Sequence, residues 1–221
     1  MRELEWTLIG GASVENKFTI IIPVYNTGNL VTRALDSIPV RDDLEVICID
    51  DCSTDNSFEI LNSYIRLPIR VFQTPVNSGP GVARNIGYDN ATGDYIFGLD
   101  SDDYLFTENF NQFLDTWNYN DYDIIHTCIL TNRGTVWGLR CECVAVHTYW
   151  LKREFMGDTR MPGTRRGEDQ TFIDALRAKK PKEGLVKAVL LHYDWGVRED
   201  SITYKFKHGL VDDNGEIIRS V

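Results

Sequence analysis

Four apolar runs recur at short intervals in the first half of the chain, and the first three are each followed by a segment with helical periodicity. The runs cover residues 17–24, 44–49, 69–73 and 95–99, and the helical segments cover residues 27–38, 53–65 and 79–91. The first run, KFTIIIPV, is almost continuously apolar, which is typical of a strand buried on both faces. This alternation predicts an α/β fold in which helices flank a mostly parallel central sheet.

The spacing of apolar residues predicts which faces of the first two helices pack on that sheet. The inward residues expected from this spacing are Leu30, Ala34, Leu35, Ile38, Phe58, Leu61 and Ile65.

The second half of the chain is less regular. Segments 107–119 and 168–180 have helical periodicity, segments 122–130 and 185–195 resemble strands, and an Asn-Gly pair within 209–220 favours a hairpin. Residues 131–167 have no assignable pattern. We therefore expect an N-terminal extension (1–16), a first α/β half (17–105), a second and more irregular half of the same domain (106–205), and a tail (206–221).

Charge and cysteine usage argue against several classes of protein. Lys and Arg number 23 against 33 Asp and Glu, a net charge of −10, which disfavours broad electrostatic binding to nucleic acid or to an anionic membrane. The five cysteines show no paired C-x-x-C units, so reduced thiols and a cytoplasmic location are expected. No run approaches the ~18 apolar residues of a membrane span. Peripheral docking at the inner face of a membrane stays open.

Polar segments follow each of the four predicted strands: YNTGN, DDCSTDNS, TPVNSGPG and DSDD. Because ligands of such sheets bind beyond the carboxyl ends of the strands, these segments are the candidate site. Neither G-x-G-x-x-G after the first strand nor G-x-x-x-x-G-K-[ST] is present, which disfavours a dinucleotide site and a P-loop. Arg84 lies in the glycine-rich segment that follows the third strand. It could reach a nucleotide or pair with the carboxylates of the DSDD segment, which we call the acidic loop; a helix-surface role is the alternative.

The acidic segment DSDD places Asp100 and Asp102 two residues apart at the end of a strand. Carboxylates so placed can converge on one cation, and Mg²⁺ and Mn²⁺ prefer oxygen ligands. From these residues alone, a solvated acidic loop is an equally open interpretation.

The combination of motifs is more specific than its parts. IIPVYN, IDDCSTDNS, NSGPGVARNIG and GLDSDD, in this order and spacing, resemble family 2 glycosyltransferases of the GT-A fold. Later segments at 151–156 (LKREFM), 167–172 (GEDQTF) and 190–203 extend the resemblance over about residues 17–205. It implies an inverting transferase that moves a sugar from a nucleotide diphosphate sugar, here a UDP-sugar, to a hydroxyl of a glycan or other acceptor.

The resemblance also implies roles for individual residues. Asp169 would be the general base, with Glu168 and Trp195 supporting the acceptor side. Asp102 and Asp100 would hold Mn²⁺ or Mg²⁺, and His192 is a further metal candidate with a structural role as the alternative. Asp103 would organise the loop. The donor nucleotide would be bound by Pro23, Tyr25, Asn26, Asp51, Arg84, Asp100 and Ser101.

Two other functions compete with this interpretation. A nucleotidyltransferase-like enzyme also combines an α/β sheet with acids and Mg²⁺, but it usually needs a basic or glycine-rich triphosphate loop, which is not evident. A catalytically inactive sugar-nucleotide-binding protein would be expected to lack a metal acid or the base, whereas Asp100, Asp102 and Asp169 are all present. The sequence does not identify the sugar, the acceptor or the oligomeric state.

Overall fold

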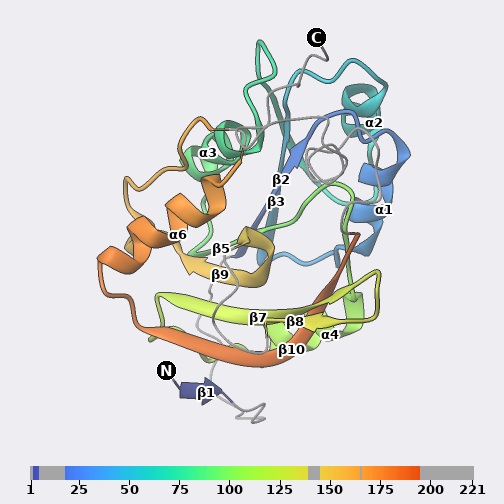
Figure 1. Ribbon diagram of the computed structural model, residues 1–221. Coiled ribbons are helices and arrows are strands. Elements are labelled where there is room, and N and C mark those ends of the chain that lie inside the picture. Colours follow the sequence, from blue (N-terminus) through green and yellow to red (C-terminus); the bar gives the residue numbers. More distant parts are fainter. Residues whose placement is uncertain (1, 5–17, 139–144, 165, 195–221) are drawn as a thin grey trace.

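The structure is a computed structural model that describes residues 2–4, 18–138, 145–164 and 166–194 (Figure 1). The sequence-based expectations that lie outside these residues include the role of Trp195, the part of the 190–203 motif after residue 194, and the tail with its hairpin within 209–220.

The described strands form one curled sheet in the order β1-β10-β7-β9-β5-β2-β3-β4, with β6 paired to β10 and β8 to β7. The strands are β1 (Arg2–Leu4), β2 (Phe18–Val24), β3 (Leu44–Asp50), β4 (Arg70–Gln73), β5 (Tyr95–Gly98), β6 (Tyr104–Leu105), β7 (Ile124–Thr131), β8 (Val136–Trp137), β9 (Tyr149–Lys152) and β10 (Glu183–Tyr193). Neighbours β5, β2, β3 and β4 are parallel, as are β1, β10 and β7. The predicted mostly parallel α/β sheet is confirmed, and residues 2–4 add a strand to its edge.

Helices cover both faces of the central strands (Figure 1). They are α1 (Asn29–Ser37), α2 (Ser57–Ser63), α3 (Pro80–Asn90), α4 (Thr107–Asp115), α5 (Arg153–Met156) and α6 (Glu168–Ala178), with a 3₁₀ helix η1 (Val146–Thr148). Alternate residues of β2 point to opposite faces. Ile20 and Ile22 therefore pack in the cluster that contains α1, while Ile21 packs in the cluster that contains α3 and α6.

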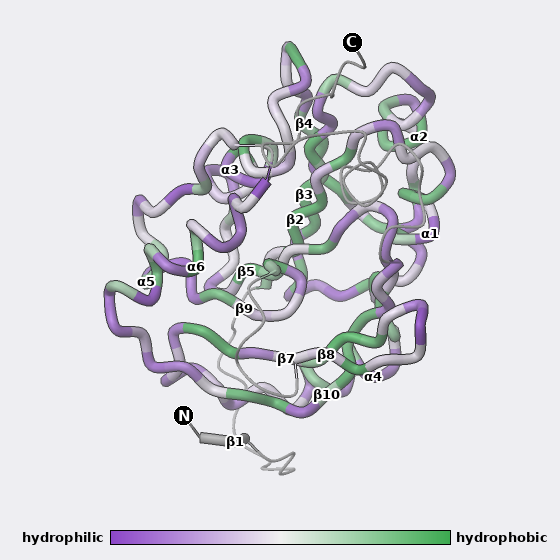
Figure 2. Tube along the Cα trace, viewed as in Figure 1, coloured by the Kyte–Doolittle hydropathy of each residue, from purple (hydrophilic) through white to green (hydrophobic). Residues whose placement is uncertain are grey.

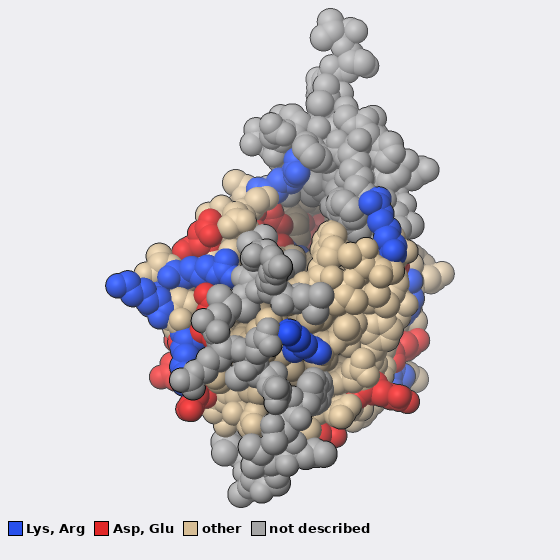
Figure 3. Space-filling model, turned by 60° about the horizontal axis from the view of Figure 1, so that its bottom comes forward, with Lys and Arg blue, Asp and Glu red and all other residues tan. Residues whose placement is uncertain are grey.

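Figure 2 shows hydrophobic residues concentrated along β2 and β3 at the centre of the molecule. Gly87 lets α3 approach this layer closely, because a Cβ atom there would lie 2.5 Å from Cγ2 of Ile21. Figure 3 shows one face of the molecule on which side chains of both charges lie around a broad uncharged area. Among the described residues visible in this view, Lys and Arg form no continuous basic surface of the kind that nucleic acids favour.

The predicted helices are present, but three expectations about their inward residues are wrong. Phe58 of α2, expected inward, is only half-buried. Val31 is buried where Leu30 was expected, and Leu30 is only half-buried. Ile65 is 94% exposed because α2 ends at Ser63 and the extended backbone of Tyr64 turns the chain away from the helical path.

The segment 131–167, which has no clear sequence pattern, joins the two halves of the sheet. Within it, β9 lies antiparallel between β5 and β7, so that Trp150 has Phe97 as its partner on one side and Ile125 on the other. Trp150 is fully buried and its ring contacts Phe97 at 4.9 Å and Phe110 at 5.6 Å. Among the described residues, no helix is long and apolar enough to cross a bilayer.

Candidate active site

The loops that follow β2, β3 and β5 meet at one edge of the sheet, next to the start of α3. The loop after β2 is braced on the loop after β3: the backbone N–H of Asn26 donates to Ser53 Oγ at 3.1 Å, and the backbone N–H of Thr54 donates to Asn26 Oδ1 at 2.7 Å. Pro23 is buried within β2, whereas Tyr25 is 40% exposed. The ring of Tyr25 is therefore more accessible than Pro23, and its contact with a donor stays a prediction.

Asp51 holds the loop between β4 and α3 in place. Its carboxylate accepts hydrogen bonds from the Thr74 hydroxyl (2.8 Å), the Ser78 N–H (2.9 Å) and the Gly79 N–H (2.7 Å). Asp51 is buried, and these hydrogen bonds give its carboxylate a structural role beside the predicted one. Its contact with a base stays a prediction.

Arg84, on α3, is the centre of a buried network of charges. Its Nη2 donates to Asp100 Oδ1 at 2.6 Å, and its Nη1 lies 3.7 Å from Glu168 Oε1 and 3.6 Å from Asp169 Oδ1. The side chain is only 5% exposed. A single guanidinium therefore links the acidic loop to the first turn of α6, which brings together predicted residues that are up to 85 positions apart in the sequence.

The network shifts the acid–base properties of its members. Burial disfavours the charge of Asp100, yet the adjacent Arg84 outweighs it and holds the pKa of this carboxyl well below its usual range. Burial, with the neighbouring charge of Asp169, raises the pKa of Glu168 to about 7. Burial also raises the pKa of Asp169, although Arg84 opposes this shift.

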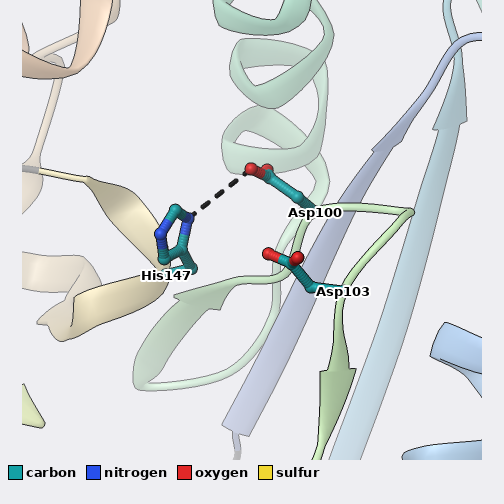
Figure 4. Close-up of side chains that lie close together, drawn as sticks. All are labelled: Asp100, Asp103 and His147. Carbon is teal, nitrogen blue, oxygen red and sulfur yellow. Dashed lines mark ion pairs between the residues drawn. The ribbon is translucent and has the colours of Figure 1, made fainter. Parts of the chain in front are cut away.

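Among the described residues, three side chains that could hold a cation lie close together where η1 meets the acidic loop. One ligand atom from each of Asp100, Asp103 and His147 lies within 4.8 Å of the others (Figure 4). Burial and the charges of Asp100 and Asp102 raise the pKa of Asp103 well above its usual value. Its Oδ2 is buried and, within the described residues, has no hydrogen-bond partner. Two carboxylates, one with an unsatisfied buried oxygen, and an imidazole fit a divalent cation.

Two predicted metal residues lie outside this group. The backbone carbonyl of Asp102 accepts a hydrogen bond from Arg33 of α1. His192 stacks on Tyr104 at 4.7 Å, and its Nδ1 lies 3.2 Å from Asp194 Oδ1. Ser101, predicted as a donor contact, is buried in the acidic loop between Asp100 and Asp102.

The family model "Glycosyl transferase family 2" matches residues 19–164. This chain belongs to glycosyl transferase family 2. The family predicted from the sequence motifs is thus confirmed.

Three relatives from this comparison illustrate how much of the chain is shared. The poly(ribitol-phosphate) beta-glucosyltransferase of Bacillus spizizenii is 45% identical over 94 residues, which are 39% of this chain and 15% of that protein. The poly(ribitol-phosphate) beta-N-acetylglucosaminyltransferase TarS of Staphylococcus aureus is 39% identical over 93 residues, 39% of this chain and 16% of that protein. An uncharacterized glycosyltransferase of Haemophilus influenzae is 48% identical over 89 residues, 38% of this chain and 36% of that protein. The matches therefore span only a small part of these relatives.

Solved structures confirm the GT-A type fold. S. aureus TarS 1-349 in complex with UDP-GlcNAc superposes with a TM-score of 0.72 at 23% identity, over 84% of this chain and 60% of that one. The mannosyltransferase PcManGT of Pyrobaculum calidifontis, in complex with GDP-Man and Mn²⁺, gives a TM-score of 0.69 at 16% identity, over 88% and 61% of the two chains.

Sequence reasoning missed three residues that the structure places against the acidic loop or its neighbours. His147 lies in the segment without assignable pattern, Arg33 reads as an ordinary helix-surface residue, and Asp194 follows the last strand. Arg33 donates to Asp194 Oδ2 at 2.6 Å, and the backbone N–H of Asp194 donates to Asp103 Oδ1 at 2.8 Å. Together they fasten the acidic loop to α1 and to the end of β10. No local sequence signal identifies such contacts, because each depends on the tertiary fold.

Proposed function

We propose that the chain is a metal-assisted, inverting glycosyltransferase that moves a hexosyl or N-acetylhexosaminyl group from a UDP-sugar to a hydroxyl of an acceptor. The observation that carries this proposal is the Arg84 network, which joins Asp100 of the acidic loop to Asp169 at the start of α6. A donor bound at the strand ends and an acceptor bound beside α6 would meet there. The cytoplasmic location indicated by the cysteine usage belongs to the same proposal.

The donor side is assigned to the first half of the chain. Tyr25 would contact the base, Asn26 and Ser101 would shape its pocket together with the buried Pro23, and Asp51 would accept from the uracil N3–H. Support for UDP comes from the structures of TarS in complex with UDP and with UDP-GlcNAc. The named relatives transfer glucosyl and N-acetylglucosaminyl groups to poly(ribitol-phosphate), so a polyol or glycan hydroxyl is the acceptor class we propose.

A divalent cation, Mn²⁺ or Mg²⁺, would be held by the carboxylates of the acidic loop, Asp100 with Asp102 or Asp103. When bound, such a cation neutralises the negative charge of the diphosphate leaving group. PcManGT, whose structure contains Mn²⁺ and GDP-Man, supports a cation at this fold's donor site.

Asp169 is the residue that we assign as general base. It heads α6, where the positive end of the helix dipole favours an ionised carboxylate, and Arg84 lies 3.6 Å from its Oδ1. Burial raises its pKa, which makes it a stronger acceptor for the proton of the attacking hydroxyl. Attack from this side, opposite the leaving diphosphate, would invert the anomeric centre. The neighbouring residue Glu168 lies near the same guanidinium, with 3.7 Å between its Oε1 and Arg84 Nη1.

A donor screen tests this function. The chain would be incubated with UDP-glucose, UDP-N-acetylglucosamine, UDP-galactose and GDP-mannose plus Mn²⁺, with and without ribitol-phosphate oligomers, and nucleoside diphosphate release would be measured. We expect UDP release from at least one UDP-sugar, lost on chelation and increased by an acceptor. Pyrophosphate release from a nucleoside triphosphate would instead indicate a nucleotidyltransferase, and UDP-sugar binding without turnover would indicate an inactive binding protein.

A further inference from the structure

His147 is placed beside the acidic loop by the packing of η1 on β5. Gly98, the last residue of β5, makes this approach feasible, because a Cβ atom at this position would lie 2.8 Å from Cγ2 of Val146. Only Leu99 separates Gly98 from Asp100 in the sequence, so the residue after Val146 reaches the start of the acidic loop. His147 Nδ1 lies 3.5 Å from Asp100 Oδ2 (Figure 4).

The imidazole is buried and its Nδ1 lacks a close partner. His147 is 3% exposed, and the distance to Asp100 is at the outer limit for a hydrogen bond. Within the described residues, neither His147 Nδ1 nor Asp103 Oδ2 has a hydrogen-bond partner. Buried polar atoms of this kind are normally satisfied, so two of them facing one small volume point to a ligand that satisfies both.

The ring is also held in orientation from its other side. It packs against Tyr193 at the end of β10, with ring centroids 4.7 Å apart and planes inclined by 31°. Because η1 and the end of β10 are both fixed to the sheet, Nδ1 is directed at the carboxylates before any ligand arrives.

From this arrangement we propose that His147 Nδ1 is a nitrogen ligand of the divalent cation, together with Asp100 and Asp103. The inference rests on the proposed function, in which the acidic loop holds that cation. Ligand atoms about 2.1 Å from a six-coordinate cation are about 3 to 4.2 Å apart, close to the spacing of this group. An imidazole ligand favours Mn²⁺ and other transition metals over Mg²⁺, which prefers oxygen. The site should therefore select Mn²⁺.

The chain's own histidines provide matched controls. It contains four, at positions 126, 147, 192 and 208. His126 is buried against Glu183 with 2.7 Å between Nε2 and Oε2, and His192 stacks on Tyr104 beside Asp194. His126 and His192 are not members of the ligand group.

The test is electron spin-echo envelope modulation of Mn²⁺ bound to the chain in the presence of UDP, with natural and ¹⁵N-histidine protein. We expect histidine nitrogen modulation in the wild type, its loss in His147→Ala and His147→Gln, and its retention in His192→Gln. Because a variant of a buried residue can fail to fold, a His126→Gln/His192→Gln/His208→Gln variant keeps His147 as the only histidine and should retain the modulation. Mn²⁺ affinity should fall at least tenfold in His147→Ala, with a smaller change for Mg²⁺.

The outcomes separate this inference from the proposed function. Mn²⁺ that binds with UDP but shows no histidine modulation, or modulation that disappears with His192→Gln, would overturn the role of His147 and leave the transferase proposal standing. An absence of Mn²⁺ binding by both wild type and the triple variant would overturn the cation itself, and with it both proposals.

Discussion

Replacing Arg84 with methionine tests whether the buried charge network is organised as described. The substitution keeps much of the side-chain volume but removes the partner of Asp100, Glu168 and Asp169, which lie 2.6, 3.7 and 3.6 Å from the guanidinium. Removing one partner of a buried ion pair typically costs about 3–5 kcal/mol, because a buried charge is left uncompensated. Domains of this kind have only about 5–15 kcal/mol of stability, so the loss would be a large fraction of the total.

The cost should depend on pH in a definite direction. Without Arg84 the carboxyls bind protons more readily in the folded state than they do in the wild type, and a protonated carboxyl needs no counter-charge. The penalty for Arg84→Met should therefore be largest near pH 8 and smaller near pH 5.5. Urea unfolding followed by circular dichroism at the two pH values measures both quantities.

Two control variants make this result interpretable. Arg84→Lys keeps a charge but loses the planar fork, so its cost should be intermediate. Arg70, whose Nη1 lies 2.7 Å from Glu45 Oε1, makes a more exposed ion pair, and Arg70→Met should cost no more than about 1 kcal/mol. The reasoning is refuted if Arg84→Met costs as little as Arg70→Met at pH 8, or if its penalty is the same at both pH values.

Three further predictions concern other parts of the site and the sheet. Asp51→Ala should weaken UDP binding in calorimetry by about 1.5–3 kcal/mol, and it should also lower the unfolding free energy, because three donors lose a charged acceptor. The pKa of Glu168 in the folded chain is about 7 against an ordinary 4.5, so its contribution to stability is present below pH 4.5 and lost as the pH rises through 7. This contribution is at most about 3 kcal/mol. Glu168→Gln should therefore remove the corresponding decrease in the urea midpoint between pH 5 and pH 8. Gly87→Ala should lower the unfolding free energy by about 1–3 kcal/mol, because the added Cβ would overlap Ile21, and an unchanged urea midpoint would contradict this packing.

The central strands were predictable because their signal is local. A continuous β-branched run such as Ile20–Ile22 is buried on both faces wherever helices cover both sides of the sheet, and the structure shows this burial. The predicted inward faces of the helices were less accurate than the predicted strands. In α1, which starts at Asn29, Val31 is buried in place of Leu30. The end of α2 carries no Gly or Pro to mark it, so the periodic pattern ran on to Ile65.

Residues of the candidate site could be predicted only where they lie in a recognisable sequence motif. Arg84, Asp100 and Asp169 come from three recognisable segments, and the structure brings them together. His147 was not predictable, because its position depends on β9 pairing between β5 and β7, which gives no periodic signal in residues 131–167. Arg33 and Asp194 were missed for the same reason: their contact joins positions 161 residues apart.

The general-base role of Asp169 is the central claim, and Asp169→Asn tests it most directly. The asparagine keeps the shape of the side chain but cannot take the proton of the acceptor hydroxyl. With the UDP-sugar found in the donor screen, turnover should fall by about 10²–10⁴, while UDP-sugar affinity measured by calorimetry should stay nearly constant, because the lost interaction belongs to the transition state. Glu168→Gln, one residue away, should retain far more turnover than Asp169→Asn. Turnover that persists in Asp169→Asn while UDP-sugar binding is lost would make Asp169 a donor ligand and contradict its role as the base.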